Sequence, residues 1–171
     1  RHMLLVKAYT NFREKKFTEC KYLIENFILN NFSKDYIYLY SLFYYSLSCY
    51  FEGDLDNSYY TLKYILFKNP YWEKMNEVYY WLSVISFEKN NYEKAIRYLN
   101  LKNSEPKFKK LKKFYLEKLN DIDIFIELIN QFPHDNDIIK SFAKFLINNK
   151  NLDLKNGFLK KIIKKYKIPI K

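Results

Sequence analysis

The chain has 171 residues, which is long enough for one domain with a buried core. Apolar residues make up 49% of it and aromatic residues 20%, so the composition excludes a disordered chain. Only two Gly and four Pro occur, and this scarcity of turn residues disfavours an all-β fold. The formal net charge is +11. We attribute part of it to an AT-rich genome, because such genomes favour the codons for Lys and Asn.

The first three residues, Arg-His-Met, are typical of a cloning remnant. We therefore expect the natural chain to extend upstream, where a targeting or anchoring segment could precede Leu4. No apolar run approaches the ~18–20 residues that a membrane-spanning helix requires. The sequence thus predicts a soluble domain, in the cytoplasm or the periplasm, without deciding between the two compartments.

Short polar turns recur along the chain, each followed by a helical apolar pattern. They span 14–17, 52–55 and 89–92, and a weaker fourth copy spans 149–152. The second position of each turn needs a residue that tolerates a helix-ending conformation, which Gly53 and Asn90 supply most readily. Asp54 and Asn91, at the third position, can cap the helix that follows. Repeated helix–turn–helix units are therefore expected.

Apolar residues at three- and four-residue spacing precede and follow each turn, which predicts an amphipathic helix on either side. Around the second turn the apolar and small residues of this pattern are Leu42, Tyr45, Ser46 and Cys49, then Ser58, Leu62 and Ile65. Two further amphipathic patterns occupy 102–134, and their members are Phe108, Leu111, Tyr115 and Leu119, then Ile122, Phe125, Ile129 and Phe132. The last helix carries the stripe Phe158, Leu159, Ile162, Ile163 and Tyr166.

This organisation resembles the tetratricopeptide repeat (TPR), a 34-residue helix–turn–helix unit with a small residue in the middle of each helix and a Pro that closes the second. The matching small residues are Ala8, Ser46, Ser83 and Ala143 in first helices, and Cys20, Ser58 and Ala95 in second helices. The dipeptide Asn69-Pro70 matches the closing position of the second copy. The resemblance implies an all-α fold, a right-handed α-solenoid of antiparallel helix pairs with about ten helices.

The copies depart from the TPR pattern in their spacing, which is 38 and then 37 residues rather than 34. Longer turns between repeats are therefore expected around 31–34 and 71–75. We expect one continuous domain, with three TPR-like repeats in 4–101 and degenerate repeats ending in a basic capping helix in 102–171. An unrelated helical bundle is the alternative.

Residues that could carry catalysis are scarce. His134 lies in a short loop before a predicted helix, and Cys20 and Cys49 fall on buried positions, where a thiol is inert. With two glycines there is no Gly-rich phosphate-binding loop. The acidic pairs 54/56, 121/123 and 135/137 lie at helix starts, where carboxylates complement the helix dipole. We therefore predict no catalytic residue, no metal site, no cofactor and no enzymatic activity.

In TPR solenoids the first helix of each pair lines a concave surface that binds peptides or partner helices. The resemblance assigns to this groove Tyr9, Phe12, Arg13, Tyr40, Phe43, Tyr44, Leu47, Tyr50, Tyr80, Val84 and Phe87, with Leu5, Phe51 and Glu88 on the same faces. Aromatic side chains are typical interface anchors, because they bury a large area with few rotatable bonds. Packing of these rings in the core is the alternative. Chaperone-binding TPR proteins use Lys and Asn here to grip a carboxylate, whereas this chain has apolar and aromatic residues, so an apolar or helical partner segment is favoured.

The positive charge is concentrated towards the C-terminus. Residues 1–101 carry a net charge of +2 and residues 102–171 one of +9. The predicted basic patch consists of Lys109, Lys110, Lys113, Lys160, Lys161, Lys164 and Lys165, and Lys112 belongs to the same run. The solvated face of a capping helix explains these lysines, and docking to an acidic protein or an anionic membrane is the alternative. Nucleic acid is disfavoured as a partner, because base-edge recognition favours Arg and the chain has almost none.

The sequence therefore predicts a non-enzymatic adaptor or scaffold that binds another protein in an aromatic groove. Analogy with divergent solenoid proteins suggests a subunit of a larger bacterial assembly, such as a motor-associated or secretion complex. The alternative is an electrostatic binding module that uses the Lys-rich C-terminal region for an anionic membrane or nucleic acid. The oligomeric state is not predicted.

Overall fold

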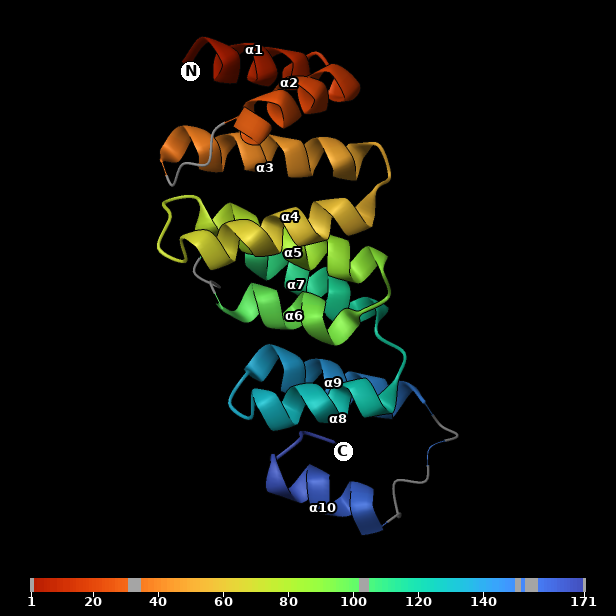
Figure 1. The fold of residues 1–171 in the computed structure, drawn as a ribbon. Helices are drawn as coiled ribbons and strands as arrows, with labels where there is room; N and C mark the ends of the chain where they lie inside the picture. The colour runs from red at the N-terminus through yellow and green to blue at the C-terminus, as the bar shows by residue number, and fades with distance from the viewer. Residues whose placement is uncertain (1, 31–34, 102–104, 150–151, 153–156, 171) are drawn as a thin grey trace. The chain divides into compact units, whose positions relative to one another are not determined.

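The structure is a computed structural model that describes residues 2–30, 35–101, 105–149, 152 and 157–170. Within these residues it is all-α, as predicted, with ten helices (Figure 1). The chain divides into two compact units. Unit 1 (Arg1–Lys89) holds α1 (His2–Arg13), α2 (Phe17–Asn30), α3 (Tyr36–Phe51), α4 (Leu55–Lys68) and α5 (Met75–Glu88). Unit 2 (Asn90–Lys171) holds α6 (Tyr92–Leu101), α7 (Pro106–Lys118), α8 (Ile122–Gln131), α9 (Asn136–Asn148) and α10 (Gly157–Lys165).

The turns within the predicted helix pairs have the backbone conformation that the sequence indicated. Lys15, Gly53 and Asn90, each at the second position of its turn, have φ of 61°, 86° and 60°. This left-handed conformation ends a helix, and Gly and Asn adopt it at the smallest steric cost. Asp54 and Asn91 cap the helices that follow, because each side chain accepts a hydrogen bond from the backbone amide three residues on (3.2 and 3.3 Å).

The small residues predicted at the centres of the paired helices are buried. Ala8, Cys20, Ser46, Ser58, Ser83 and Ala95 are 0% exposed, and Ala143 is 4% exposed. The Ser46 hydroxyl is satisfied within its own helix, where it donates a 2.7 Å hydrogen bond to the Phe43 carbonyl oxygen. A larger side chain at such a position would push packed helices apart.

Within each unit, contacts follow the order expected of stacked helical repeats. In unit 1, α1 packs on α2 and α3, α2 on α3, α3 on α4, and α4 on α5. In unit 2, α6 packs on α7 and α8, and α9 packs on the same two helices. Side-chain hydrogen bonds join residues 33 to 38 positions apart, namely Thr18–Glu52, Tyr40–Glu73 and Tyr50–Glu88 in unit 1, and Glu93–Gln131 and Asn100–Asp135 in unit 2. This recurrence at about one repeat length is typical of a repeat fold.

Several smaller predictions about helix boundaries are also confirmed. Helix α4 ends at Lys68 with Asn69 as its C-cap, so the helix stops before Pro70. Helices α7 and α8 match the two amphipathic patterns in 102–134, and they bury Phe108, Tyr115, Phe125 and Ile129. The predicted turn at 31–34 and residues 150–151 of the predicted fourth turn lie outside the described residues. Among the helices that the structure describes, none combines the length and the apolar character that crossing a membrane requires.

Candidate functional site

The first helices of the predicted pairs in unit 1 place aromatic rings in an unbroken series. We call this set the aromatic ladder. Its members in order are Tyr9, Tyr44, Phe12, Phe51, Trp81 and Tyr80, and consecutive ring centroids lie 5.2, 5.4, 6.0, 5.8 and 5.7 Å apart. All five distances fall in the range of favourable contacts between aromatic rings. The ladder therefore links α1, α3 and α5 through side-chain contacts.

The helical period explains why α3 supplies the middle of this series. Tyr40, Tyr44 and Phe51 are spaced by four and seven residues, so they lie on one face of the helix. Asp35 caps α3 by accepting a 3.0 Å hydrogen bond from the backbone amide three residues on, which starts the helix at Tyr36. Tyr40 extends the aromatic contacts beyond the ladder, with its ring 6.5 Å from Tyr44 and 5.1 Å from Trp72.

The ladder is only partly covered by the rest of unit 1. Phe51 keeps 49% of its surface exposed and Tyr9 keeps 38%, while the other four members are half-buried. A contiguous, partly exposed apolar surface is unfavourable in water and is typical of a binding surface. The fixed rings could contribute to binding at a small cost in side-chain entropy.

The residues predicted for the groove fall into four groups. Tyr9, Phe12, Tyr44 and Tyr80 belong to the ladder, and Tyr40, Tyr50 and Arg13 contact it. Phe43 and Leu47 are buried, with 8% and 5% of their surfaces exposed, so they contribute packing rather than surface. Val84 and Phe87 are half-buried on α5.

Trp81 is the main ladder residue that sequence reasoning missed. Its ring lies 5.1 Å from Tyr50 and 5.8 Å from Phe51, so it connects α5 to α3. It directly follows Tyr80 on a helix already assigned to the groove, and its size and position were signals that could have identified it. Phe17 was also missed, although it stacks on Phe51 at 5.2 Å, because it begins a second helix rather than belonging to a first.

Two carboxylates lie beside the ladder, each held by a tyrosine of α3. The Tyr40 hydroxyl donates a 2.9 Å hydrogen bond to Glu73, and the Tyr50 hydroxyl donates one of 2.5 Å to Glu88. Burial, together with the bond to Glu73, raises the pKa of Tyr40 to about 12. The Tyr40 hydroxyl therefore stays protonated and remains a donor at neutral pH. Both glutamates are exposed to solvent.

Among the described residues, the fold does not bring together side chains suited to catalysis. Cys20 and Cys49 are 0% exposed, and burial raises the pKa of both thiols, that of Cys49 to about 11. Because the thiolate is the nucleophilic form, neither thiol is activated. His134 is exposed in the loop between α8 and α9. In the described part of the chain, no three or more His, Cys, Asp or Glu side chains are grouped so that they could hold a metal ion.

All the lysines of the predicted basic patch are exposed, and they belong to two helices of unit 2. Lys109, Lys110 and Lys113 lie on α7, whereas Lys160, Lys161, Lys164 and Lys165 lie on α10. Helix α7 packs on α6 and α9, while Tyr166, just after α10, donates a hydrogen bond to Asn130 of α8. The two groups of lysines therefore have different neighbours in the fold.

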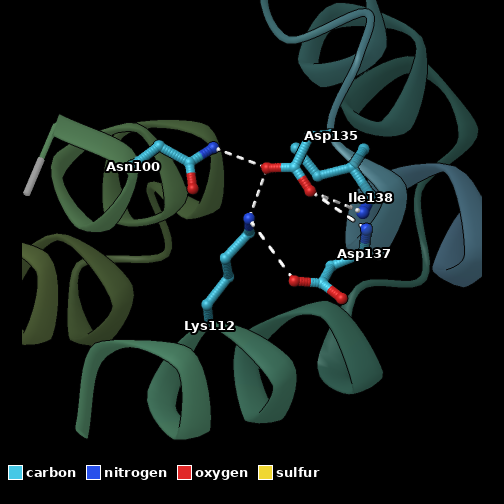
Figure 2. Close-up of polar contacts among 5 residues, drawn as sticks. All are labelled: Asn100, Lys112, Asp135, Asp137 and Ile138. Atoms are coloured by element: carbon cyan, nitrogen blue, oxygen red, sulfur yellow. Dashed lines mark hydrogen bonds and ion pairs between the residues drawn. The ribbon is translucent and has the colours of Figure 1, made fainter. Parts of the chain in front are cut away.

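Lys112 differs from the lysines around it, because it is buried and paired (Figure 2). Its ammonium group contacts the Asp135 carboxylate and lies 3.9 Å from that of Asp137. Asp135 also accepts a 3.1 Å hydrogen bond from the Asn100 side chain and caps α9. Asp135 thus joins α6, α7 and α9, and Lys112 contributes to the packing of unit 2 rather than to its surface charge.

No protein-family model matches the chain, and no curated protein sequence matches it. Two solved structures do match. They are crystal structures of a protein from Podosopora anserina, one of them of a variant, described as a kinesin light chain with nearly identical TPR-like repeats. The matches cover 97% of this chain and 92% and 94% of those chains, each with a TM-score of 0.51 and 9% sequence identity. Taken with the repeated turns, buried small residues and helix order, this likeness shows that the chain has a TPR-like helical-repeat fold.

Proposed function

We propose that this chain is a non-enzymatic adaptor that binds a segment of another protein on the aromatic ladder of unit 1. The observation that carries the proposal is the continuity of the ladder across α1, α3 and α5, with Phe51 half exposed in its middle. Interfaces concentrate their binding energy in a few large aromatic side chains held in fixed positions. A row of such rings suits an extended or helical segment better than a small compact ligand.

The rest of the proposal concerns the setting in which the adaptor works. Membership of a larger bacterial assembly, such as a motor-associated or secretion complex, remains a prediction from composition and analogy. The proposal requires only that some partner protein contact the ladder. It assigns no catalytic role to the buried thiols or to His134.

Alanine substitutions in the ladder test this proposal. We would immobilise the wild-type chain, a Tyr9→Ala/Tyr80→Ala variant and a Tyr60→Ala control, and quantify the proteins that each captures from native extract. Tyr60 is a matched control because it lies on α4 and is 67% exposed. We expect a partner that wild type and control retain and that the ladder variant captures about tenfold less, which corresponds to about 1.4 kcal/mol. Circular dichroism would verify that all three are folded, and equal capture by the three would refute the proposal.

An electrostatic binding module is the second candidate, and the seven exposed lysines on α7 and α10 favour it. Each lysine near an anionic membrane contributes about 1 kcal/mol, and salt screens this attraction. The test is co-sedimentation with vesicles that contain an anionic lipid, for wild type and for a variant with Lys160, Lys161, Lys164 and Lys165 changed to Glu. This candidate requires binding that added salt and the charge reversal both abolish. If vesicle binding is lost only in the Tyr9→Ala/Tyr80→Ala variant, the electrostatic candidate is excluded.

A further inference from the structure

Two of the three helices that carry the ladder, α3 and α5, differ in charge from the chain as a whole. About one residue in six of the whole chain is Lys or Arg, and the net charge is +11. Helices α3 and α5 nevertheless contain neither Lys nor Arg, and their only charged residues are Glu77 and Glu88. Glu73 precedes α5 by two positions. Helices α3 and α5 therefore contribute no cation to the ladder, whereas α1 contributes Arg13, which lies over the Tyr9 ring.

Two of these carboxylates are fixed next to aromatic rings. Glu73 accepts a hydrogen bond from the hydroxyl of Tyr40, whose ring contacts Tyr44 of the ladder. Glu88 accepts the hydroxyl of Tyr50, whose ring lies 5.2 Å from Phe51. A carboxylate can accept about four hydrogen bonds, so one bond from tyrosine leaves it able to accept others. Tyr40 and Tyr50 are ten residues apart on α3, so their Cα atoms are separated by about 15 Å along the helix axis.

A cationic side chain is the group that such a surface recognises best. The face of a Tyr or Trp ring attracts a cation placed within about 6 Å of its centroid. This chain already makes contacts of that kind, with Arg13 5.8 Å from the Tyr9 ring and Lys68 5.3 Å from the Tyr64 ring. A carboxylate beside the ring adds a charge-assisted hydrogen bond to the same cation. Rings and carboxylates together thus provide both kinds of contact.

We propose that the aromatic ladder binds a partner segment that carries Lys or Arg, with cationic side chains on the rings and paired with Glu73 and Glu88. The proposal rests on the proposed function and specifies the charge of the partner, which the sequence analysis expected to be apolar. An acidic segment would be repelled by both glutamates. A wholly apolar segment would desolvate the carboxylates without compensating them.

A second copy of this chain is the competing occupant, because α10 exposes a run of lysines. Such an occupant would make the protein associate with itself as its concentration rises, and changing Lys160, Lys161, Lys164 and Lys165 to Glu would abolish the association. Sedimentation velocity over a range of concentrations distinguishes the two cases. We expect no self-association that depends on these lysines, and observing it would overturn the assignment to a separate partner.

Selection from a random peptide display library tests the proposal directly. The library would be panned against wild type, Glu73→Gln/Glu88→Gln, Tyr9→Ala/Tyr80→Ala and the Tyr60→Ala control. Gln retains an oxygen that accepts the tyrosine hydroxyl, so the double Gln variant removes charge and keeps the hydrogen bonds. We expect peptides enriched in Lys and Arg on wild type and control, no such enrichment on the double Gln variant, and no enrichment on the double Ala variant.

Selected peptides would then be synthesised with norleucine in place of Lys and citrulline in place of Arg. Affinities would be measured by calorimetry, and the fluorescence of Trp81 would report whether the ladder is occupied, with Trp81→Phe to separate its signal from that of Trp72. We expect the neutral peptides to bind wild type about tenfold more weakly than the charged ones. On Glu73→Gln/Glu88→Gln the difference should shrink to about twofold or less.

Each other outcome has a definite meaning. Uncharged apolar peptides that bind wild type and not the double Ala variant would overturn the basic-partner proposal and leave the adaptor proposal standing. Acidic peptides that bind wild type and not the double Ala variant would likewise overturn the basic-partner proposal and leave the adaptor proposal standing. Peptides that bind the double Ala variant as well as wild type, or no enrichment on either, would overturn both proposals.

Discussion

The Lys112 ammonium group is buried against the carboxylate of Asp135, the residue that caps α9 (Figure 2). One oxygen of Asp135 accepts hydrogen bonds from the backbone amides of Asp137 and Ile138, at 3.0 and 3.2 Å. The other accepts Lys112 and the Asn100 side chain. A single carboxylate therefore caps the start of α9 and binds side chains of α6 and α7.

Replacing Lys112 by Met should destabilise unit 2, because it leaves the partly buried Asp135 carboxylate without its cation. Breaking a buried pair from one side costs about 3 kcal/mol. Urea denaturation followed by circular dichroism would measure the change in the free energy of unfolding. Lys113→Met is the matched control, since Lys113 is the exposed neighbour on the same helix, and it should change stability by about 0.5 kcal/mol or less.

A second substitution checks the physical cause of this loss. Lys112→Met/Asp135→Asn removes both charges, while Asn retains an oxygen that can cap α9. We expect the double variant to recover part of the stability that Lys112→Met loses. If the double variant were as unstable as the sum of the two single variants, the loss would come from packing of the Lys112 stem rather than from the unpaired charge.

Gly53 should be sensitive to substitution for a reason that involves the backbone alone. Its φ is +86°, and a Cβ built on it would meet no atom within 4 Å. Gly53→Ala should therefore cost about 1 kcal/mol through left-handed strain, without any clash. Gly157→Ala is the control, because Gly157 has equally open surroundings and lies in α10 without a positive φ. Thermal denaturation should show a lower Tm for the first variant only.

At the first turn, the opposite substitution, from a larger residue to Gly, should stabilise the protein. Lys15 has φ of 61° at the position that Gly53 occupies in the second turn, so a side chain is strained there. Lys15→Gly should raise the free energy of unfolding by about 0.5–1 kcal/mol. Chemical denaturation would measure the gain, and a decrease would mean that the Lys15 side chain makes a stabilising contact that outweighs the strain.

These turns indicate what the sequence could predict and what it could not. A left-handed residue at positions 15, 53 and 90 and a small residue at 8, 46 and 83 are each required once per repeat by local sterics, so the period alone locates them. Lys112 was grouped with exposed lysines because its partner is 23 residues away, and helical periodicity says nothing about which neighbour brings a carboxylate. Phe43 and Leu47 were assigned to a groove face for the same reason, whereas packing of α3 buries them.

Enlarging a small helix-centre residue should destabilise the repeat packing. Ala143 is 4% exposed on α9, which packs on α7 and α8. Ala143→Leu inserts three carbon atoms between packed helices and should cost about 1–3 kcal/mol. Lys144→Leu places the same side chain on the adjacent, exposed position and should stay within about 0.5 kcal/mol of wild type. Urea denaturation compares the two, and similar losses would show that the helix centre tolerates volume.

Slow alkylation of Cys20 and Cys49 is the expected signature of two structural thiols. Burial raises the pKa of Cys49 to about 11, so at about pH 8 roughly a thousandth of it is thiolate, whereas an unperturbed cysteine with a pKa of about 8.5 is roughly a quarter ionised. Iodoacetamide labelling followed by mass spectrometry should therefore be slow in native buffer and should accelerate in urea as the helices unfold. Tyr60→Cys provides a matched exposed thiol on α4 and should react at the rate of a free cysteine. Rapid labelling of Cys20 or Cys49 in the folded protein would show that solvent reaches the centre of the helix pair, and the close approach of helices inferred from the small residues would then be wrong.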